Sequence, residues 1–183
     1  TSGVLLVAKS LAAARELSTA FEERQVAKQY LAVVRGEVAQ AEGEVDVPIA
    51  QRSGGRMQLR GKRAKPALSH YRVAERFRGF TLLEVEPHTG RQHQVRLHCA
   101  SLGHPLAVDP LYGARDAVYL SEIKMGYRPK KDRPEAPLLA RLSLHARRIE
   151  VPRPGGARLA VEAPVPEDLE RLLRMLRKYA GKG

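Results

Sequence analysis

The sequence contains a single cysteine, Cys99, and no tryptophan. One cysteine excludes an intrachain disulfide and a four-cysteine zinc site. Aromatic residues make up only 5% of the chain, which argues against a broad stacking platform for single-stranded nucleic acid. No apolar run approaches the ~20 residues of a membrane-spanning helix. Because no signal peptide is visible either, we expect a cytoplasmic protein without a membrane partner.

Acidic residues are the minority among charged residues. The 183 residues include 32 Lys and Arg against 20 Asp and Glu, a formal net charge of +12. The first 50 residues hold five basic and seven acidic side chains, whereas residues 51–78 hold nine basic and one acidic. A basic cluster of this density favours a polyanionic partner, most often nucleic acid. The alternative is a solvated basic face that serves solubility.

The spacing of apolar residues predicts one α+β domain with a mixed, largely antiparallel sheet and flanking helices. Ser10 is expected to cap a helix whose apolar face holds Leu11, Ala14, Leu17 and Phe21. We expect strands over 3–9, 28–38, 69–76, 80–86, 142–151 and 157–161, and helices over 11–23, 89–102 and from Pro166 onward. The 3–9 strand is expected to be buried. Residues 51–67 are expected to form a loop or an irregular hairpin, and residues 113–138 a polar loop. The last helix has an apolar face of Leu169, Leu172, Leu173 and Leu176.

The densest group of polar residues lies at 87–98 (PHTGRQHQVRLH), where a predicted strand ends and a predicted helix begins. Thr89 and Gln92 have the spacing of a capping box, and Gly103 would end the helix. A helix N-terminus presents free amides, and Arg91 and His93 would add positive charge there, so the pattern indicates an anion site. The alternative is a basic surface helix.

Four histidines fall between positions 88 and 104: His88, His93, His98 and His104. The intervals 88–93 and 93–98 are five residues, not the four that align two metal ligands on a helix. The chain also has no second cysteine and no H-E-x-x-H sequence. We therefore expect no metal site. Asp109, which precedes Pro110, is expected to cap backbone amides in a turn rather than to act in catalysis.

Several segments, in order, resemble the RluA family of RNA pseudouridine synthases. HTGRQHQVR at 88–96, GHPL at 103–106 and DPLYG at 109–113 look like the family's signature. TSGVLLVAK at 1–9 resembles the end of its H-R-L-D-x-x-T-S-G motif, and KQYLA at 28–32 its K-x-Y-L-A motif. SLHA at 143–146 and APVP at 163–166 resemble its C-terminal L-H-A and A-P-L-P segments. Together these segments cover nearly the whole chain.

The resemblance implies a pseudouridine synthase fold with a central active-site cleft, and an enzyme that converts uridine to pseudouridine in ribosomal or transfer RNA. No metal or redox cofactor is implied. Tyr30 matches the tyrosine that stacks on the flipped base, and Arg96 the arginine that pairs with the nucleophilic Asp. We assign Arg91, His93 and Gln94 to RNA and substrate positioning and expect Leu144 beside the base. The RNA-phosphate contacts are assigned to the basic segment, with Arg52, Arg60, Lys62, Arg63 and Lys65.

The nucleophile that the resemblance implies is absent from this sequence. In the family it is the Asp of H-R-L-D, just upstream of T-S-G, and this chain begins at that Thr. We expect residues 1–183 to form a monomeric catalytic domain that is incomplete at its N-terminus, with the Asp upstream of Thr1. The alternative is an inactive RNA-binding module that uses the same cleft. A ribosome-associated structural protein would explain the charge but not the ordered motifs.

Overall fold

β-Strands supply most of the framework in the computed structural model, which describes residues 1–183 except 53, 55, 130–131, 154–155 and 182–183. Its strands are β1 (Ser2–Gly3), β2 (Ala27–Arg35), β3 (Glu42–Asp46), β4 (Ile49–Gln51), β5 (Met57–Leu59), β6 (Leu68–Phe77), β7 (Phe80–Pro87), β8 (Leu144–Pro152) and β9 (Arg158–Glu162). Its helices are α1 (Leu11–Glu22), α2 (Gln94–Ser101), α3 (Leu120–Ile123) and α4 (Glu167–Ala180).

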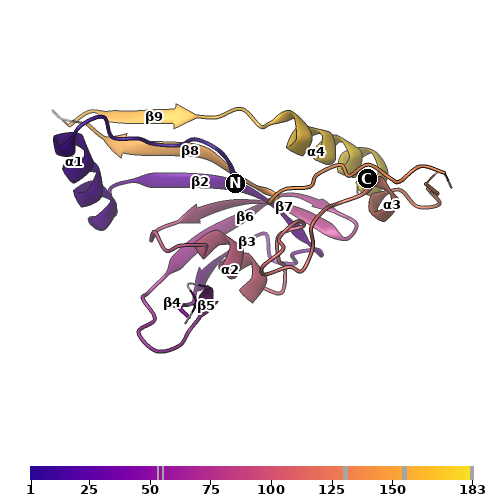
Figure 1. The fold of residues 1–183 in the computed structure, drawn as a ribbon, viewed down its shortest axis with the longest axis horizontal. Helices are drawn as coiled ribbons and strands as arrows, with labels where there is room; N and C mark the ends of the chain where they lie inside the picture. The colour runs from indigo at the N-terminus through magenta and orange to yellow at the C-terminus, as the bar shows by residue number, and fades with distance from the viewer. Residues whose placement is uncertain (53, 55, 130–131, 154–155, 182–183) are drawn as a thin grey trace.

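Within the described residues, seven strands form one mixed sheet in the order β1-β8-β2-β7-β6-β3, with β9 pairing to β8 as well. The short β1 runs parallel to β8, and the other pairs in this sheet are antiparallel. A separate antiparallel hairpin, β4–β5, projects below α2 in the view of Figure 1. This α+β architecture with a largely antiparallel sheet confirms the predicted fold class.

Strand β2 lies in the middle of the sheet and is covered on both faces. Leu31 and Val33 belong to the core packed by α4, whereas Ala32 and Val34 belong to the core packed by α2. Alternate side chains of a strand point to opposite faces, so the apolar run at 31–34 satisfies both cores. The two cores hold β2 between α2 and α4, which fixes the position of Tyr30, the fourth residue of this strand.

The predicted helices 11–23 and 166 onward are confirmed, but the apolar face of the first is not. Ser10 caps α1 by accepting a hydrogen bond from the Ala13 amide at 3.1 Å. Ala20 is the buried residue of α1, while Leu11 is 79% exposed and Phe21 42%. The helix packs through its C-terminal half against β8, so its first turn projects beyond the core. On α4 the four expected leucines are all buried: Leu169, Leu172, Leu173 and Leu176.

The prediction of a buried strand over 3–9 was wrong. Pairing with β8 ends when the Val4 amide donates to the Ala146 carbonyl oxygen at 2.9 Å, and the following residues are irregular. Leu5 is 84% exposed and Val7 70%. Residues 4–8 are continuously apolar, as in a strand buried on both faces, but no described layer of the molecule covers Leu5 and Val7. A short apolar run is consistent with a buried strand, and it does not show that the fold supplies a second layer over that run.

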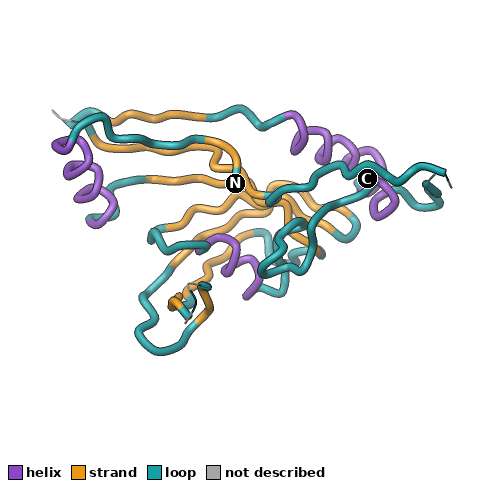
Figure 2. Tube along the Cα trace, in the orientation of Figure 1, coloured by secondary structure: helices purple, strands orange, loops and turns teal. Residues whose placement is uncertain are grey.

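The remaining loops agree broadly with expectation. Residues 51–67 contain part of the β4–β5 hairpin, which confirms the alternative of an irregular hairpin. The chain between α2 and β8 is mostly loop, with one short helix, α3, inside the predicted 113–138 loop (Figure 2). Among the described residues, no helix is both long and apolar enough to cross a membrane.

Candidate functional site

A cavity of about 770 Å³ lies where β2, β8, the end of β7 and the start of α2 meet. Six of the residues assigned to the site from the sequence line it: Tyr30, Arg91, His93, Gln94, Arg96 and Leu144. The first five residues of the chain, 1–5, form part of the same wall. Segments separated by more than 60 residues in sequence therefore converge on one concave site.

Gly3 explains how the N-terminal segment reaches this wall. Its φ angle is +108°, a conformation that other residues rarely adopt, and a Cβ atom there would lie 2.1 Å from the Ala146 carbonyl oxygen. A glycine is therefore required for the chain to run this close to β8. Thr1 and Ser2 follow the same path along the cavity, and the Ser2 hydroxyl lies 3.1 Å from His145 Nδ1.

Tyr30 presents a free hydroxyl to the cavity. The side chain is half-buried in the wall, and no hydrogen-bond partner for its hydroxyl exists among the described residues. Burial raises the pKa of Tyr30, so the hydroxyl stays protonated at neutral pH. A protonated phenol on an aromatic ring can stack on a base and donate or accept one hydrogen bond.

Arg96 is held by Asp109. Its Nε donates to Asp109 Oδ2 at 2.8 Å and its Nη2 to Oδ1 at 2.7 Å, and both side chains are almost completely buried. Nη1 has no hydrogen-bond partner among the residues that the structure describes. The guanidinium also lies over the Tyr112 ring, 4.8 Å from its centroid. One edge of Arg96 is thus fixed, and the remaining nitrogen can bind an acceptor in the cavity.

Asp109 has the structural role expected from the sequence, and a further one. Its Oδ1 accepts hydrogen bonds from the amides of Leu111 at 3.0 Å and Tyr112 at 3.1 Å, as a turn-capping Asp should. Burial favours the neutral acid, but the bonds from Arg96 and from the two amides outweigh burial and hold the pKa of Asp109 below its usual value. No sequence pattern indicated that Arg96 and Asp109 would form a pair.

His93 lies beside this pair as a neutral imidazole. It occupies the N-cap position of α2 with a left-handed φ of 58°, and its Nδ1 lies 2.9 Å from the Tyr112 hydroxyl. Burial, followed by the nearby Arg96 charge, lowers the pKa of His93, so it carries no charge at neutral pH. The direction of this shift disfavours the expected positive charge at the helix N-terminus, and the contact that His93 makes is a hydrogen bond.

Gln94 is buried, and its side chain links the loop before α2 to β6. Its Oε1 accepts from the Thr89 hydroxyl at 2.7 Å and the Arg91 amide at 3.0 Å. Its Nε2 donates to the Leu68 carbonyl and the Ser69 hydroxyl, each at 2.9 Å. Because the Gln94 side-chain amide bonds to these protein groups, its role is to hold the cavity wall in shape.

The predicted capping box between Thr89 and Gln92 was wrong, because the Thr89 hydroxyl bonds instead to the Gln94 side chain and to the Leu68 amide. Helix α2 consequently begins at Gln94, five residues later than expected.

Arg91 and Leu144 complete the set of six. Arg91 is partly exposed at the cavity rim, where its Nε donates to the Pro66 carbonyl at 3.1 Å. Leu144 begins β8 opposite Ala32, and its buried side chain contributes apolar surface. A base that enters the cavity would therefore meet an apolar wall, an aromatic ring and cationic nitrogens.

The basic segment does not line this cavity. All five of its assigned residues are exposed on the β4–β5 hairpin and the loop that follows: Arg52, Arg60, Lys62, Arg63 and Lys65. The hairpin is attached to α2 through a small core of Ile49, Ala67 and Leu97. Tyr112 strengthens this attachment by donating from its hydroxyl to the Met57 carbonyl at 3.3 Å. The basic hairpin is thus joined to the residue that also contacts Arg96 and His93.

The clustered histidines lie in separate environments. His98 is buried between the Ser69 hydroxyl and the Val47 carbonyl, His104 bonds to the Arg35 carbonyl, and His88 lies against the His70 ring. Within the described residues, no group of three or more His, Cys, Asp or Glu side chains could hold a metal ion. Burial raises the pKa of Cys99 to about 12, so this thiol is a core residue.

Two residues of the site were not assigned from the sequence. Lys28 lines the cavity together with Tyr30, two positions away on β2, and Tyr112 contacts both His93 and Arg96. The signal for Lys28 was present, since residues i and i+2 of a strand share a face. Tyr112 lies in the DPLYG segment at 109–113, but nothing in that segment indicated its contacts with His93 and Arg96.

Comparisons with known proteins agree with this geometry. The family model described as RNA pseudouridylate synthase matches residues 1–101. The chain is 38% identical over 182 residues to "Ribosomal large subunit pseudouridine synthase D" of Nitrosomonas europaea, covering 97% of this chain and 48% of that protein. It is also 38% identical over 182 residues to "Ribosomal large subunit pseudouridine synthase C" of Escherichia coli K12, covering 97% and 53%. The chain thus spans about half the length of these relatives.

Solved structures show the same fold. "Human RNA Pseudouridylate Synthase Domain Containing 1" matches with a TM-score of 0.66 at 27% identity, covering 97% of this chain and 76% of that one. "Human RNA Pseudouridylate Synthase Domain Containing 4" matches with a TM-score of 0.66 at 23% identity, covering 92% and 69%, and supports the fold alone. The family match over more than half of the chain, together with these relatives, establishes that the chain belongs to the RNA pseudouridylate synthase family.

Proposed function

We propose that the protein isomerises specific uridines to pseudouridine in RNA, with the 770 Å³ cavity as its active site. The observation that carries this proposal is the convergence of Tyr30, Arg96 and the Thr1–Leu5 segment on one cavity. The reaction breaks the bond between ribose C1′ and uracil N1 and forms one between C1′ and C5. The C5 hydrogen leaves as a proton and N1 gains one, so no other reactant is consumed.

The proposed nucleophile is an Asp in the residues that precede Thr1 in the full protein. Because Thr1 and Arg96 line the same cavity, a residue shortly before Thr1 can reach the Nη1 edge of Arg96. A charge-assisted bond from Arg96 would keep that carboxylate ionised and aimed at C1′. Covalent catalysis by the carboxylate then divides one difficult step into two easier ones. Residues 1–183 would form most of this catalytic domain.

The other residues of the cavity have roles that follow from their contacts. A uracil in a helix is inaccessible, so the target must be flipped out at a cost of a few kcal/mol. Tyr30 would stack on the flipped base, and its hydroxyl is available during removal of the C5 proton. Leu144 supplies the apolar surface beside the base, while Arg91 at the rim would contact the RNA backbone. His93 and Gln94 would act by holding the loop and Tyr112 in place.

The names of the relatives favour large-subunit ribosomal RNA over transfer RNA as the substrate. A cytoplasmic location and a monomeric active form are parts of the same proposal.

The test is to map pseudouridine in ribosomal and transfer RNA from cells that lack the gene. We expect a specific ribosomal uridine to be unmodified and to be restored by the full-length gene. An unchanged pseudouridine map would contradict the proposal. The sequence encoded upstream of Thr1 distinguishes the enzyme from the alternative, an inactive RNA-binding module. The enzyme needs the H-R-L-D sequence there, and the inactive module would lack it.

A further inference from the structure

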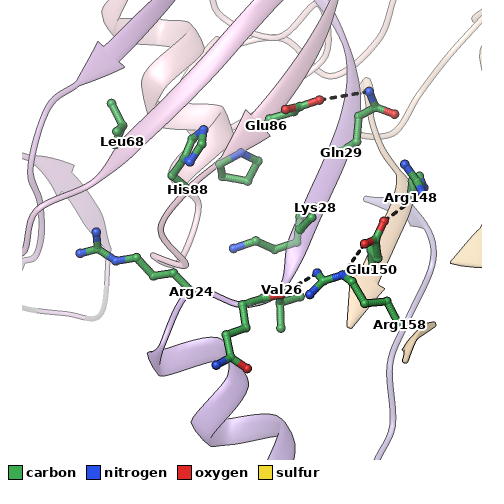
Figure 3. Close-up of a pocket in the computed structure, with 13 residues that line it drawn as sticks. Arg24, Val26, Lys28, Gln29, Leu68, Glu86, His88, Arg148, Glu150 and Arg158 are labelled. Carbon is green, nitrogen blue, oxygen red and sulfur yellow. Dashed lines mark hydrogen bonds and ion pairs between the residues drawn. The ribbon is translucent and has the colours of Figure 1, made fainter. Parts of the chain in front are cut away.

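A second cavity, of about 590 Å³, is shown in Figure 3. It adjoins the first cavity, and the two share Lys28 and Pro87 in their walls. It is formed by the turn between α1 and β2 together with parts of β2, β7, β8 and β9. Four of its lining residues are basic: Arg24, Lys28, Arg148 and Arg158. None of the residues assigned from the sequence lies here, so the proposed isomerisation leaves the second cavity without a function.

The carboxylates in this cavity are engaged with other groups. Glu150 pairs with Arg148 at 2.9 Å and with Arg158, while Glu86 accepts a hydrogen bond from the Gln29 side chain at 3.3 Å. Arg24 and Lys28 have no carboxylate partner among the described residues. Figure 3 shows the guanidinium of Arg24 and the ammonium of Lys28 extending to the same side of the pocket, away from the Glu150 ion pairs.

Lys28 has unused hydrogen-bonding capacity at the junction of the two cavities. Its ammonium is partly buried and donates to the Thr89 carbonyl at 3.0 Å, which leaves two of its three N–H groups without a described protein acceptor. Burial lowers the pKa of Lys28, as expected for a cation without a nearby carboxylate. The ammonium also lies 5.8 Å from the centroid of the Phe21 ring, and an anion placed here would add the counter-charge that no described carboxylate supplies.

A third, smaller hollow of about 300 Å³ connects the cations. It is lined by Phe21, Glu22, Arg24, Thr89, Gly90 and Arg91, so it joins the turn before β2 to the rim of the first cavity. Arg91, Lys28 and Arg24 therefore lie along one continuous concave surface. The basic β4–β5 hairpin is a different element, and its exposed cations do not line this surface.

We propose that the RNA strand flanking the target uridine runs from the first cavity past Lys28 into the second, with its phosphates bound by Arg24 and Lys28. This inference rests on the proposed function, since it assumes that RNA is the substrate. A single strand fits the observations better than a duplex, because flipping a base opens the pairing locally and the cations line hollows in the surface. The α1–β2 turn would then determine which RNA contexts bind well.

The test compares salt-dependent RNA binding by the full-length protein and by two variants. Arg24→Asn removes the charge and keeps a residue that tolerates the left-handed φ of 59° found there. Arg15→Asn is the matched control, because Arg15 is exposed on α1 and lines none of the three cavities. The plot of log affinity against log salt should be shallower by about 0.7 for Arg24→Asn, the value for one lost single-strand contact. Arg15→Asn should match wild type.

Removing the single-stranded flank from the RNA should abolish the difference between Arg24→Asn and wild type. Parallel salt plots for wild type and Arg24→Asn would overturn the inference. Equal shallowing in both variants would also overturn it, since the effect would then be one of net charge. A persistent difference on RNA without the flank would show that the flank does not lie here. These are equilibrium measurements, so a wild-type protein that binds RNA but forms no pseudouridine would refute the proposed function separately.

Discussion

Arg96 and Asp109 form a two-point ion pair beneath the cavity, with bonds of 2.8 and 2.7 Å and the Asp109 side chain completely buried. Asp109 is also bonded to two amides of its own turn, so contacts other than Arg96 also hold the carboxylate in place. The pair therefore sets the orientation of the guanidinium. Asp109 itself does not line the cavity, so it is a positioning residue for Arg96.

Replacing Asp109 by Asn should lower the free energy of unfolding by about 3–5 kcal/mol, because it leaves the Arg96 charge buried without a counter-charge. The measurement is urea unfolding of wild type and variant. Asp116→Asn is the matched control, since Asp116 is exposed on the same loop and should change stability by less than about 0.5 kcal/mol. Equal stability of Asp109→Asn and wild type would contradict a structural role for the pair.

The same pair predicts how stability depends on pH. The pKa of Asp109 is lowered in the folded protein, so its contribution is fully present above the unfolded value of about 3.9 and is lost as pH falls through the lower folded value. Wild type should therefore lose stability on acidification below about pH 4, and Asp109→Asn should lose less over the same range. Asp168, whose pKa is lowered by Arg141, remains in both proteins and serves as an internal reference.

Arg96 variants separate catalysis from folding. Arg96→Ala should reduce turnover by orders of magnitude, but it also leaves Asp109 buried without its partner. Arg96→Lys keeps the charge and loses the two-point geometry, so it should fold better and still turn over slowly. The measurement is the single-turnover rate at saturating RNA, with affinity determined in parallel. A normal rate for a folded Arg96→Lys protein would show that turnover does not depend on the two-point orientation of Arg96.

Tyr30 variants separate stacking from the hydroxyl. Tyr30→Phe keeps the ring, whereas Tyr30→Ala loses both ring and hydroxyl. If the ring stacks on the flipped uracil, the Ala variant should weaken substrate capture by about 1–3 kcal/mol more than the Phe variant does. Capture is measured as the affinity of the full-length protein for substrate RNA. The same behaviour of both variants in affinity and in rate would contradict the stacking role.

The basic hairpin should contribute affinity without touching the uracil. Arg60 and Arg63 have φ angles of 57° and 58°, so Asn is the appropriate replacement there, combined with Lys62→Ser and Lys65→Ser. The quadruple variant should bind any RNA more weakly and with a shallower salt dependence. Salt plots parallel to wild type would show that the hairpin does not contact phosphate. The cations of the 113–138 loop would then be the candidates for these contacts.

Much of the site could be predicted because the fold brings together the strands and the helix that carry the motif residues. Tyr30 lies in a central strand, Arg96 lies in the helix on one face of that strand, and Leu144 begins the neighbouring strand. The sequence did not indicate what holds these residues. The partner of Arg96 is a loop residue 13 positions away, and Gln94 is bonded to Leu68 and Ser69 in a distant strand.

Local patterns failed where tertiary contacts override them. Thr89 has a capping-box spacing, yet its hydroxyl bonds to a buried amide that only the folded sheet supplies. Leu5 and Val7 belong to a continuous apolar run typical of a buried strand, yet no described element packs over them. Arg24 lies in no quoted motif, and the turn between α1 and β2 brings it into the same cavity as Lys28.

The most direct test of the cavity as an isomerisation site uses substrate RNA carrying tritium at uracil C5. Rejoining the base through C5 expels that hydrogen, so the full-length wild-type protein should release one tritium to water for each pseudouridine formed. Tyr30→Ala and Arg96→Lys should bind the RNA and release tritium far more slowly. No release by wild type, or release by these variants at the wild-type rate, would contradict the assignment of this cavity as the active site.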